Sequence, residues 1–345
     1  MQKLFITGVS GFIGLHMALE GLKKGYEVVG TVRSQEKKDE VINTLEKYIS
    51  SEVLEKLSIQ QCDLLKPENW VEAMKGCDAI LHVASPFLRE LPKDEMDIIN
   101  PARLGVKHVF EAALANGITR IVQTSSSVAM MYGHEAGCIN FDETDWTNLN
   151  GPMISPYIKS KTLAEMDVWQ YVKDNPTLQV TCVNPGFVLG PVLGSDVGTS
   201  PYIVQKMMNG DYPGVPKLGF PTVDVRDVVA IHFAALTSEK AIGQRYAATS
   251  SSIWFKDIAA IILKAYPGYK KYVKARELPN WFIKIYSIFE TSTRMIVPEL
   301  GFCAHFSTKK IEEDLGIHPI SAEDAVIACA QSLINLNLLK FYPKN

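Results

Sequence analysis

The sequence lacks the residue patterns that mark disulfide-bonded and metal-binding proteins. Its six cysteines lie far apart and form no Cys-x-x-Cys pair, and its seven histidines have no metal-like spacing. The cysteines are Cys62, Cys77, Cys138, Cys182, Cys303 and Cys329. We therefore expect free thiols, no signal peptide, a cytoplasmic location and no bound metal.

The sequence also has little net charge and no long hydrophobic run. The net charge is −3, and the lysines and arginines are scattered, so no basic stripe is present that would neutralise a nucleic-acid backbone. The longest apolar stretch, near 228–236, is interrupted by His232 and is far shorter than the roughly 20 residues that span a bilayer. We expect no nucleic-acid or membrane partner, and the sequence does not decide between a monomer and a homodimer.

What the chain does have is a regular alternation of short β-branched runs and helical patterns. Six strands are predicted, at Lys3–Thr7, Glu27–Val32, Ser58–Cys62, Ala79–Val83, Arg120–Thr124 and Gln179–Val183. Helices are predicted near Phe12–Lys24, Lys37–Tyr48, Pro101–Asn116 and Ser155–Asp174. This alternation predicts an α/β fold of the Rossmann type, with a doubly wound parallel sheet and right-handed crossovers.

Three glycines join the first predicted strand to the first predicted helix. A pyrophosphate rests on a helix N-terminus only where the backbone comes close. Gly8 therefore suits the tight turn, Gly11 the approach of the phosphate, and Gly14 the packing of the helix, with Phe12 and Ile13 beside them at the helix start. An ordinary glycine-rich turn is the alternative, but the order of strand, turn and helix favours a dinucleotide site.

The end of the second predicted strand indicates which dinucleotide binds. An NAD site has a carboxylate there, whereas this chain has Arg33, with Lys37 four residues later. Both cations can bind a 2′-phosphate, so NADPH is the predicted cofactor unless the two are solvated surface charges. Asp63 and Leu64 follow the third strand and are placed to meet the adenine, although Asp63 can equally be a turn residue or a helix cap.

A tyrosine and a lysine lie one helical turn apart at Tyr157 and Lys161. An ammonium group near a phenol favours the phenolate and lowers the phenol pKa, which would make Tyr157 a usable general acid. The fifth predicted strand ends in a run of hydroxyl side chains at 124–127, where open α/β sheets bind ligands. The alternatives are an exposed surface pair and a polar turn.

The chain changes character after Pro185, where glycine and proline become frequent up to Pro221. An apolar run at 223–229 then leads into another helix, so we expect the chain to leave the sheet and return to it. The predicted parts are an NADP-binding domain at 1–188, rejoined by about 221–249, a smaller mixed α/β substrate-binding lobe at 189–220 and 250–322, and a C-terminal helix and tail at 323–345. Helices near 255–265 and 281–290 are predicted in the lobe.

Together these motifs resemble an extended short-chain dehydrogenase/reductase. The motifs that carry the resemblance are Thr7–Gly14, the serine-rich strand end, Tyr157 with Lys161, Asn184–Gly186 and Val223–Val228. Three further segments, Thr31–Arg33, His82–Pro86 and Lys159–Glu165, are similar to the branch of dihydroflavonol reductases, cinnamoyl-CoA reductases and methylglyoxal or aldehyde reductases. The resemblance implies NADPH-dependent reduction of a small-molecule carbonyl without a metal.

The resemblance also implies a role for each site residue. Ser126 would hydrogen-bond the substrate carbonyl, with Ser127 as its rival, Tyr157 would protonate it, and Lys161 would hold the nicotinamide ribose. The other cofactor positions that it implies are Ala84, Ser85, Thr124, Pro185, Gly186 and Val188. The substrate pocket is expected at Phe87, Met131 and Tyr202, although core filling is an equal alternative for Met131.

Two departures from the family pattern narrow the substrate. The residues around the tyrosine are Ile154–Ile158 instead of the Asn-Trp-Tyr-Cys-Tyr of cinnamoyl-CoA reductases, which argues against a CoA thioester. Met131 stands where plant flavonoid reductases have a polar residue, which argues against a flavonoid. The alternative functions are an NAD-dependent sugar-nucleotide epimerase or hydroxysteroid dehydrogenase of the extended family, and a non-catalytic NADPH sensor.

Overall fold

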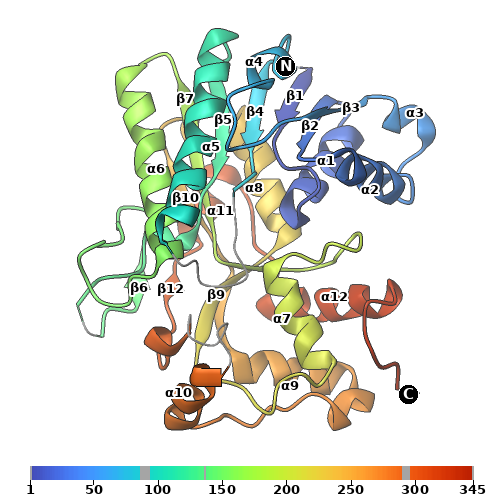
Figure 1. Ribbon diagram of the computed structural model, residues 1–345, viewed down its shortest axis with the longest axis vertical. Helices are drawn as coiled ribbons and strands as arrows, with labels where there is room; N and C mark the ends of the chain where they lie inside the picture. The colour runs from blue at the N-terminus through green and yellow to red at the C-terminus, as the bar shows by residue number, and fades with distance from the viewer. Residues whose placement is uncertain (1, 86–93, 136, 290–295, 344–345) are drawn as a thin grey trace.

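The computed structural model describes residues 2–85, 94–135, 137–289 and 296–343, and its main feature is a parallel sheet (Figure 1). Within the described residues, seven strands pair in the order β10-β7-β5-β4-β1-β2-β3. They are β1 (Lys3–Ile6), β2 (Glu27–Val32), β3 (Leu57–Gln61), β4 (Ala79–His82), β5 (Arg120–Thr124), β7 (Gln179–Pro185) and β10 (Arg245–Ala248). All six neighbouring pairs are parallel, which confirms the predicted doubly wound α/β fold.

The seventh strand, β10, is an addition that the sequence did not predict. Its four residues include no β-branched side chain, so the run carries little intrinsic strand signal. It pairs with β7 from Arg245 opposite Cys182 to Ala248 opposite Pro185. Its position on the edge of the sheet is decided by this pairing rather than by local propensity.

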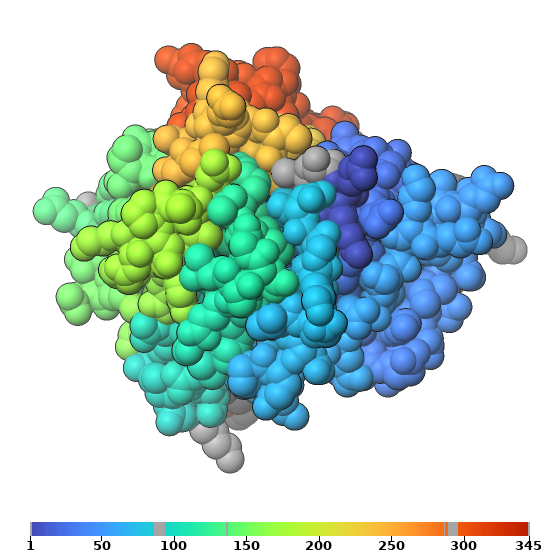
Figure 2. All heavy atoms as spheres, turned by 90° about the horizontal axis from the view of Figure 1, so that it is seen from above, coloured from blue at the N-terminus to red at the C-terminus, as the bar shows by residue number. Residues whose placement is uncertain are grey.

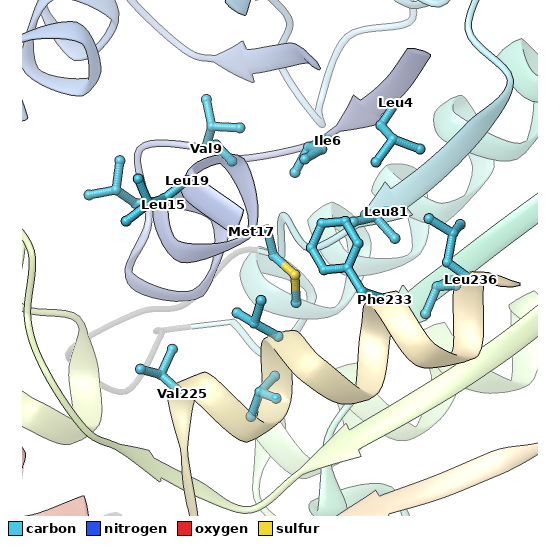
Figure 3. Close-up of a cluster of buried hydrophobic side chains, with 14 of the residues drawn as sticks. Leu4, Ile6, Val9, Leu15, Met17, Leu19, Leu81, Val225, Phe233 and Leu236 are labelled. Carbon is cyan, nitrogen blue, oxygen red and sulfur yellow. The ribbon is translucent and has the colours of Figure 1, made fainter. Parts of the chain in front are cut away.

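Helices cover both faces of the sheet, and strand β1 shows how the alternation of side chains divides them. Leu4 and Ile6 belong to one buried cluster and Phe5 to another, since successive side chains of a strand point to opposite faces. The first cluster includes Met17 and Phe233, as Figure 3 shows. The helices of the first cluster are α1 (Phe12–Lys23), α2 (Gln35–Leu45) and α8 (Val225–Thr237), and those of the second are α5 (Met96–Ala115) and α6 (Pro156–Asp174).

Helix α5 begins five residues before its predicted start and contains Pro101 in its interior. A proline there removes one backbone hydrogen bond, so the sequence pattern favoured a start at the proline. Ile98, Ile99 and Ala102 are all buried in the observed helix. Burial of these apolar side chains offsets the cost of the proline and extends the helix.

A second, smaller part of the molecule attaches where β7 ends. Strand β7 leads through Gly186 into β8 (Phe187–Leu189), which joins β9 (Gly219–Asp224) and β11 (Ser251–Trp254) in a sheet of order β11-β9-β8. The helices of this part are α7 (Thr199–Met208), α9 (Phe255–Ala265), α10 (Asn280–Phe289) and α12 (Ala322–Asn335), which gather at the lower end of the molecule in Figure 1. The attachment at the carboxyl end of β7 puts this part beside the edge where α/β sheets bind ligands.

The predicted C-terminal helix corresponds to α12, and it packs inside the second part. Val326 and Cys329 of α12 share one buried cluster with Val204 of α7 and Ile258 of α9. The predicted helices at 255–265 and 281–290 correspond to α9 and α10. The boundaries of the predicted domains stay a prediction.

The remaining elements are short and connect these parts. They are α3 (Ser51–Leu54), α4 (Trp70–Ala73), α11 (Lys309–Leu315), the two-residue strands β6 (Asn140–Phe141) and β12 (His305–Phe306), and the 3₁₀ turns η1 (Ser127–Ala129), η2 (Glu239–Ala241), η3 (Pro267–Lys271) and η5 (Val297–Glu299). In the view from above in Figure 2, the first half of the chain spreads over most of the visible face and C-terminal elements lie along one edge. Among the described residues, no helix is both long and apolar enough to cross a membrane.

Candidate active site

The glycine turn after β1 has the geometry that a dinucleotide phosphate needs. Gly8 has a φ of +70°, a backbone conformation that favours glycine. A Cβ atom on Gly14 would lie 2.2 Å from the Gly8 carbonyl oxygen, so only glycine lets α1 pack onto the turn. A Cβ atom on Gly11 would meet nothing closer than that same oxygen at 3.5 Å, which leaves open space over the turn. The three glycines therefore fit the roles predicted for them.

The start of helix α1 is suited to an anion. Gly11 is its N-cap, no side-chain cap bond is formed there, and the first turn contains no acidic residue. The N–H groups of a first helical turn have no partner within the helix and point outward, with the positive end of the helix dipole behind them. The first turn, with Phe12 and Ile13, therefore fits a pyrophosphate.

Hydrogen bonds of Thr7 and His82 fix the backbone next to the glycine turn. The Thr7 hydroxyl oxygen accepts hydrogen bonds from the backbone N–H groups of Val83 and Ala84, each at 2.9 Å, and lies 2.8 Å from Nδ1 of His82. Burial lowers the pKa of His82 to about 3, so its ring is neutral at neutral pH. The histidine is thus a core residue whose ring has a hydrogen-bond partner. Ala84 packs directly against Gly8.

The two cations predicted to bind the 2′-phosphate lie at the start of α2. The Arg33 side chain is exposed, and within the described residues its guanidinium has no hydrogen-bond or ion-pair partner. Ser34 caps the helix by accepting a hydrogen bond from the Lys37 N–H at 3.3 Å. The Lys37 ammonium pairs with Glu40 at 2.7 Å, and this hydrogen bond raises the lysine pKa. Both cations thus belong to the short segment between the end of β2 and the first turn of α2.

Asp63 and Leu64 are held by contacts of their own. The Asp63 carboxylate accepts a hydrogen bond from the Leu65 N–H at 3.0 Å, and its carbonyl oxygen accepts one from the Trp70 indole at 3.1 Å. The carbonyl oxygen of Leu64 lies 2.9 Å from Nδ1 of His108. Asp63 is therefore a turn residue, as the alternative expectation had it, and contact of either residue with adenine stays a prediction.

The structure brings Ser126, Tyr157 and Lys161 together at the carboxyl end of β5. Ser126 is the N-cap of η1, where its hydroxyl oxygen accepts a hydrogen bond from the Val128 N–H at 3.4 Å, and its hydroxyl is also hydrogen-bonded to Tyr157. The Lys161 ammonium lies 5.9 Å from the centroid of the Tyr157 ring. Ser127, the rival serine, is the first residue of η1 and is buried.

Burial controls the ionisation of the tyrosine and the lysine. Burial raises the pKa of Tyr157, the hydrogen bond to Ser126 lowers it, and the negative charge of Glu299 raises it. Burial also lowers the pKa of Lys161, to about 8. The expected lowering of the phenol pKa by Lys161 is not seen, because burial dominates the shift. The tyrosine is thereby kept protonated, as a proton donor must be.

Several predicted cofactor residues line one small cavity beside these side chains. Its volume is about 10 Å³, which is room for about one water molecule, and Ala84, Ser85, Thr124 and Lys161 are among its lining residues. The Thr124 hydroxyl lies 2.7 Å from Nε2 of His232 and is engaged by that ring. The residues predicted for the ribose therefore lie together.

The segment predicted to border the nicotinamide is fixed against the second part of the molecule. A Cβ atom on Gly186 would lie 2.0 Å from the Pro221 carbonyl oxygen, so the close approach of β9 requires glycine. Val188 pairs with Val223 in the parallel ladder of β8 and β9. Pro185 is the last residue of β7, which places the whole segment at the carboxyl edge of the main sheet.

A buried polar network lies behind the catalytic side chains. The Glu165 side chain is completely buried, and its carboxylate accepts hydrogen bonds from the Ser125 hydroxyl, from Asn184 Nδ2 at 2.6 Å and from Arg245 Nε at 2.6 Å. Asn184 Nδ2 also donates to the Ser126 carbonyl oxygen at 3.1 Å. The network therefore ties α6, β5, β7 and β10 together directly behind Ser126.

None of these network residues has a predicted role of its own. One signal was present, because Glu165 follows Lys161 by four residues and so lies on the same face of the helix. Its partner Arg245 is 80 residues away in the sequence, and no local pattern connects the two.

The structure describes two of the three residues predicted for the substrate pocket, and their contact with a substrate stays a prediction. Met131 is 4% exposed and packs in an apolar cluster that includes Tyr132 and Ile158, so it fills a core instead of facing open space. Tyr202 on α7 lines a hollow of about 320 Å³ that also includes Lys37, on the side of the predicted 2′-phosphate cations. Phe87 lies outside the described residues.

Comparisons with known proteins show the family to which the chain belongs. Residues 4–248 match the NAD dependent epimerase/dehydratase family. The NADPH-dependent methylglyoxal reductase GRE2 of Saccharomyces cerevisiae is 29% identical to this chain over 290 residues, which cover 78% of this chain and 84% of the relative. Cinnamoyl-CoA reductase 1 of Petunia hybrida is 30% identical and covers 90% of this chain, with 92% of the relative matched.

Solved structures resemble the chain along nearly its full length. The crystal structure of yeast methylglyoxal/isovaleraldehyde reductase Gre2 complexed with NADPH superposes with a TM-score of 0.80 at 24% sequence identity. The match covers 97% of this chain and 99% of that one. This likeness supports the observed fold, including the second part of the molecule.

Proposed function

Because the chain belongs to the NAD dependent epimerase/dehydratase family, we propose that it is an NADPH-dependent carbonyl reductase of small aldehydes or ketones. It is an oxidoreductase, and its relatives bear the names of NADPH-dependent methylglyoxal reductase and cinnamoyl-CoA reductase. The observation that carries the proposal is the hydrogen bond between Ser126 and Tyr157 with the Lys161 ammonium over the tyrosine ring. These are the groups needed to bind a carbonyl oxygen and to deliver a proton to it.

The chain has a suitable place for each part of NADPH. The glycine turn and the start of α1 fit the pyrophosphate, since a Cβ atom on Gly8 or Gly14 would clash while Gly11 leaves space. Arg33 and Lys37 would bind the 2′-phosphate, and Ala84, Ser85 and Lys161 would lie along the nicotinamide half. When bound, NADPH supplies the hydride that reduces the carbonyl carbon.

Three side chains would perform the protein's share of the reaction. The Ser126 hydroxyl donates a hydrogen bond to the carbonyl oxygen and so fixes and polarises the substrate. The Tyr157 hydroxyl donates its proton to the same oxygen as negative charge develops there. The Lys161 ammonium holds the nicotinamide ribose and stabilises the phenolate that remains, which prepares Tyr157 to regain a proton from solvent.

One part of the molecule would bind the cofactor and the other would bind the substrate. We assign NADPH binding to residues 1–188 together with about 221–249, and substrate binding to the lobe at 189–220 and 250–322. The departure from the cinnamoyl-CoA reductase pattern at Ile154–Ile158 favours a small carbonyl compound over a CoA thioester. Arg33 at the end of β2 disfavours the alternative of an NAD-dependent epimerase or hydroxysteroid dehydrogenase.

The test follows NADPH absorbance with a panel of aldehydes, diketones, ketoesters and aryl ketones, using wild type and Tyr157→Phe. The variant removes one proton donor, so turnover is expected to fall about 10²–10⁴-fold while NADPH affinity stays within about twofold. Tyr171→Phe, on the same helix and packed on Phe110, is the matched control and should keep full activity. Retained turnover in Tyr157→Phe would contradict the mechanism, and NADPH binding without any turnover by wild type would favour a sensor.

A further inference from the structure

A carboxylate from the second part of the molecule lies beside the catalytic tyrosine. Glu299 ends the 3₁₀ turn η5, and its carboxylate accepts a hydrogen bond of 2.8 Å from the hydroxyl of Tyr132. Tyr132 is 3% exposed, its N–H donates to the Thr147 hydroxyl at 3.1 Å, and its ring packs on Phe302 with 5.6 Å between centroids. One oxygen of the carboxylate is therefore fixed by a rigid partner.

The same contacts put this carboxylate close to the reacting atoms. Tyr132 follows Ser126 by six residues, and it packs in one apolar cluster with Ile158, the residue after Tyr157. The charge of Glu299 acts on the Tyr157 hydroxyl and contributes to its raised pKa, after burial and against the Ser126 hydrogen bond. The Glu299 carboxylate, hydrogen-bonded to Tyr132, is thus near enough to the Tyr157 hydroxyl for its charge to act there.

Glu299 has no counter-charge within the described part of the chain. No lysine, arginine or histidine there forms an ion pair with it, and burial raises its pKa to about 7. Glu299 as a whole residue is partly exposed. A carboxylate held away from water without a cation is costly, and a donor group on a ligand relieves that cost.

We propose that Glu299, anchored by Tyr132, forms a substrate subsite that selects carbonyl compounds carrying a hydrogen-bond donor, a hydroxyl or an ammonium group, next to the reacting carbonyl. This rests on the proposed reductase function and adds a substrate class to it. The donor group binds the free oxygen of the Glu299 carboxylate while the carbonyl oxygen binds Ser126 and Tyr157. A substrate bearing a carboxylate at the same position would be repelled.

Three ketones of nearly equal shape test the subsite, namely hydroxyacetone, aminoacetone and butanone, which place a hydroxyl, an ammonium or a methyl group at one position. A pair one carbon longer, 4-hydroxybutanone and pentanone, tests the reach of the carboxylate. For wild type, kcat/KM for a donor-bearing ketone is expected to exceed that for its apolar partner by about tenfold or more. The hydroxyl and ammonium arms show which donor is preferred.

The decisive readout is the change of this ratio in Glu299→Leu and Glu299→Gln, because intrinsic differences in ketone reactivity cancel in the comparison with wild type. We expect the ratio to fall about tenfold in Glu299→Leu, mainly through KM for the donor-bearing ketone, and any effect of the lost charge on Tyr157 acts on both ketones and cancels in the ratio. Tyr132→Phe keeps the aromatic packing but removes the hydroxyl that donates a hydrogen bond to Glu299. This variant should lower the ratio by a smaller factor. Glu313→Gln on α11, whose side chain is 64% exposed, is the matched control and should leave the ratio unchanged.

An unchanged ratio in both Glu299 variants would overturn the subsite and leave the proposed reductase function intact. A wild-type enzyme that reduces no carbonyl compound with NADPH would instead refute the reductase function, and the subsite would fall with it. A lower ratio in Glu299→Leu supports both.

Discussion

The ionisation of individual side chains in the site is controlled more by burial than by neighbouring charges. Burial raises the pKa of Tyr157 and lowers that of Lys161 to about 8. Two buried histidines behave likewise, since burial lowers the pKa of His82 to about 3 and that of His232 to about 4. Both rings are neutral at neutral pH and serve as hydrogen-bonding links between strands and helices. The proton chemistry is thus left to Tyr157 and Lys161.

Arg33 is the residue on which the choice of cofactor depends. Replacing it in Arg33→Ala removes a charge-assisted contact to the 2′-phosphate, so kcat/KM with NADPH should fall about tenfold to hundredfold, while the value with NADH changes little. Steady-state kinetics with both cofactors measure the ratio. Arg276→Ala, another exposed arginine, serves as the control and should leave it unchanged. An unaltered NADPH preference in Arg33→Ala would mean that Arg33 is only a surface charge.

Among the elements, helix α6 carries most of the chemistry. Tyr157, Lys161 and Glu165 follow one another at intervals of four residues and share one face. Ser155 caps the helix by accepting a hydrogen bond from the Ile158 N–H at 3.3 Å, which fixes the turn that presents Tyr157. Through Glu165 the same helix is joined to Arg245 on the sheet edge, so the position of α6 depends on that buried pair.

The Glu165–Arg245 pair predicts a large loss of stability when one partner is changed. Glu165→Gln leaves the Arg245 charge buried without its carboxylate, so the free energy of unfolding should fall by about 3–5 kcal/mol. Urea unfolding followed by circular dichroism measures the loss. The exposed pair of Lys264 and Glu323 offers the comparison, because Glu323→Gln should cost less than about 1 kcal/mol. Equal effects of the two substitutions would contradict a structural role for the network.

The glycine turn predicts opposite outcomes for two substitutions three residues apart. Gly14→Ala places a Cβ atom 2.2 Å from the Gly8 carbonyl oxygen, so helix α1 must shift and stability should fall. Gly11→Ala meets no protein atom within 3.4 Å, so the melting temperature should stay close to wild type while NADPH affinity falls about tenfold or more. Thermal unfolding and fluorescence titration with NADPH separate the two effects. Full NADPH affinity in Gly11→Ala would argue against a phosphate over the turn.

For the whole molecule, the decisive arrangement is the attachment of the second part at the carboxyl edge of the sheet. Glu299 and Tyr132 come from segments 167 residues apart, and they meet beside Tyr157 only because η5 packs on the loop that follows β5. The proposed site is therefore composite, with the proposed cofactor residues from the sheet and a carboxylate from the second part.

A cofactor that binds only the folded chain should stabilise the molecule as a whole. At 100 times its dissociation constant, NADPH is expected to raise the free energy of unfolding by about 2.7 kcal/mol, and NADH at the same concentration by clearly less. Differential scanning fluorimetry at increasing concentrations of each cofactor measures the shift. Equal shifts with NADPH and NADH would contradict the NADPH preference. Arg33→Ala should reduce the NADPH shift toward the NADH value.

Patterns within short segments were sufficient for much of the fold and for the centre of the site. Six strands of the main sheet, the glycine turn and the four-residue spacing of Tyr157 and Lys161 are local features, because strand period, turn conformation and helix period are properties of neighbouring residues. Strand β10 and the early start of α5 were not predicted from local patterns. Pairing with β7 decides the position of β10, and burial of Ile98 and Ile99 decides the start of α5. In both elements, tertiary packing outweighs the local sequence preference.

The sequence by itself thus predicted six strands of the main sheet, the glycine turn and the helical spacing of Tyr157 and Lys161, which we propose as the catalytic pair. Only the tertiary structure decided that Arg245 neutralises Glu165, that Met131 fills a core, and that Glu299 stands beside Tyr157. The physical reason is that partners distant in the sequence meet through the packing of whole elements, and burial then sets the charge, hydrogen bonds and pKa of each side chain.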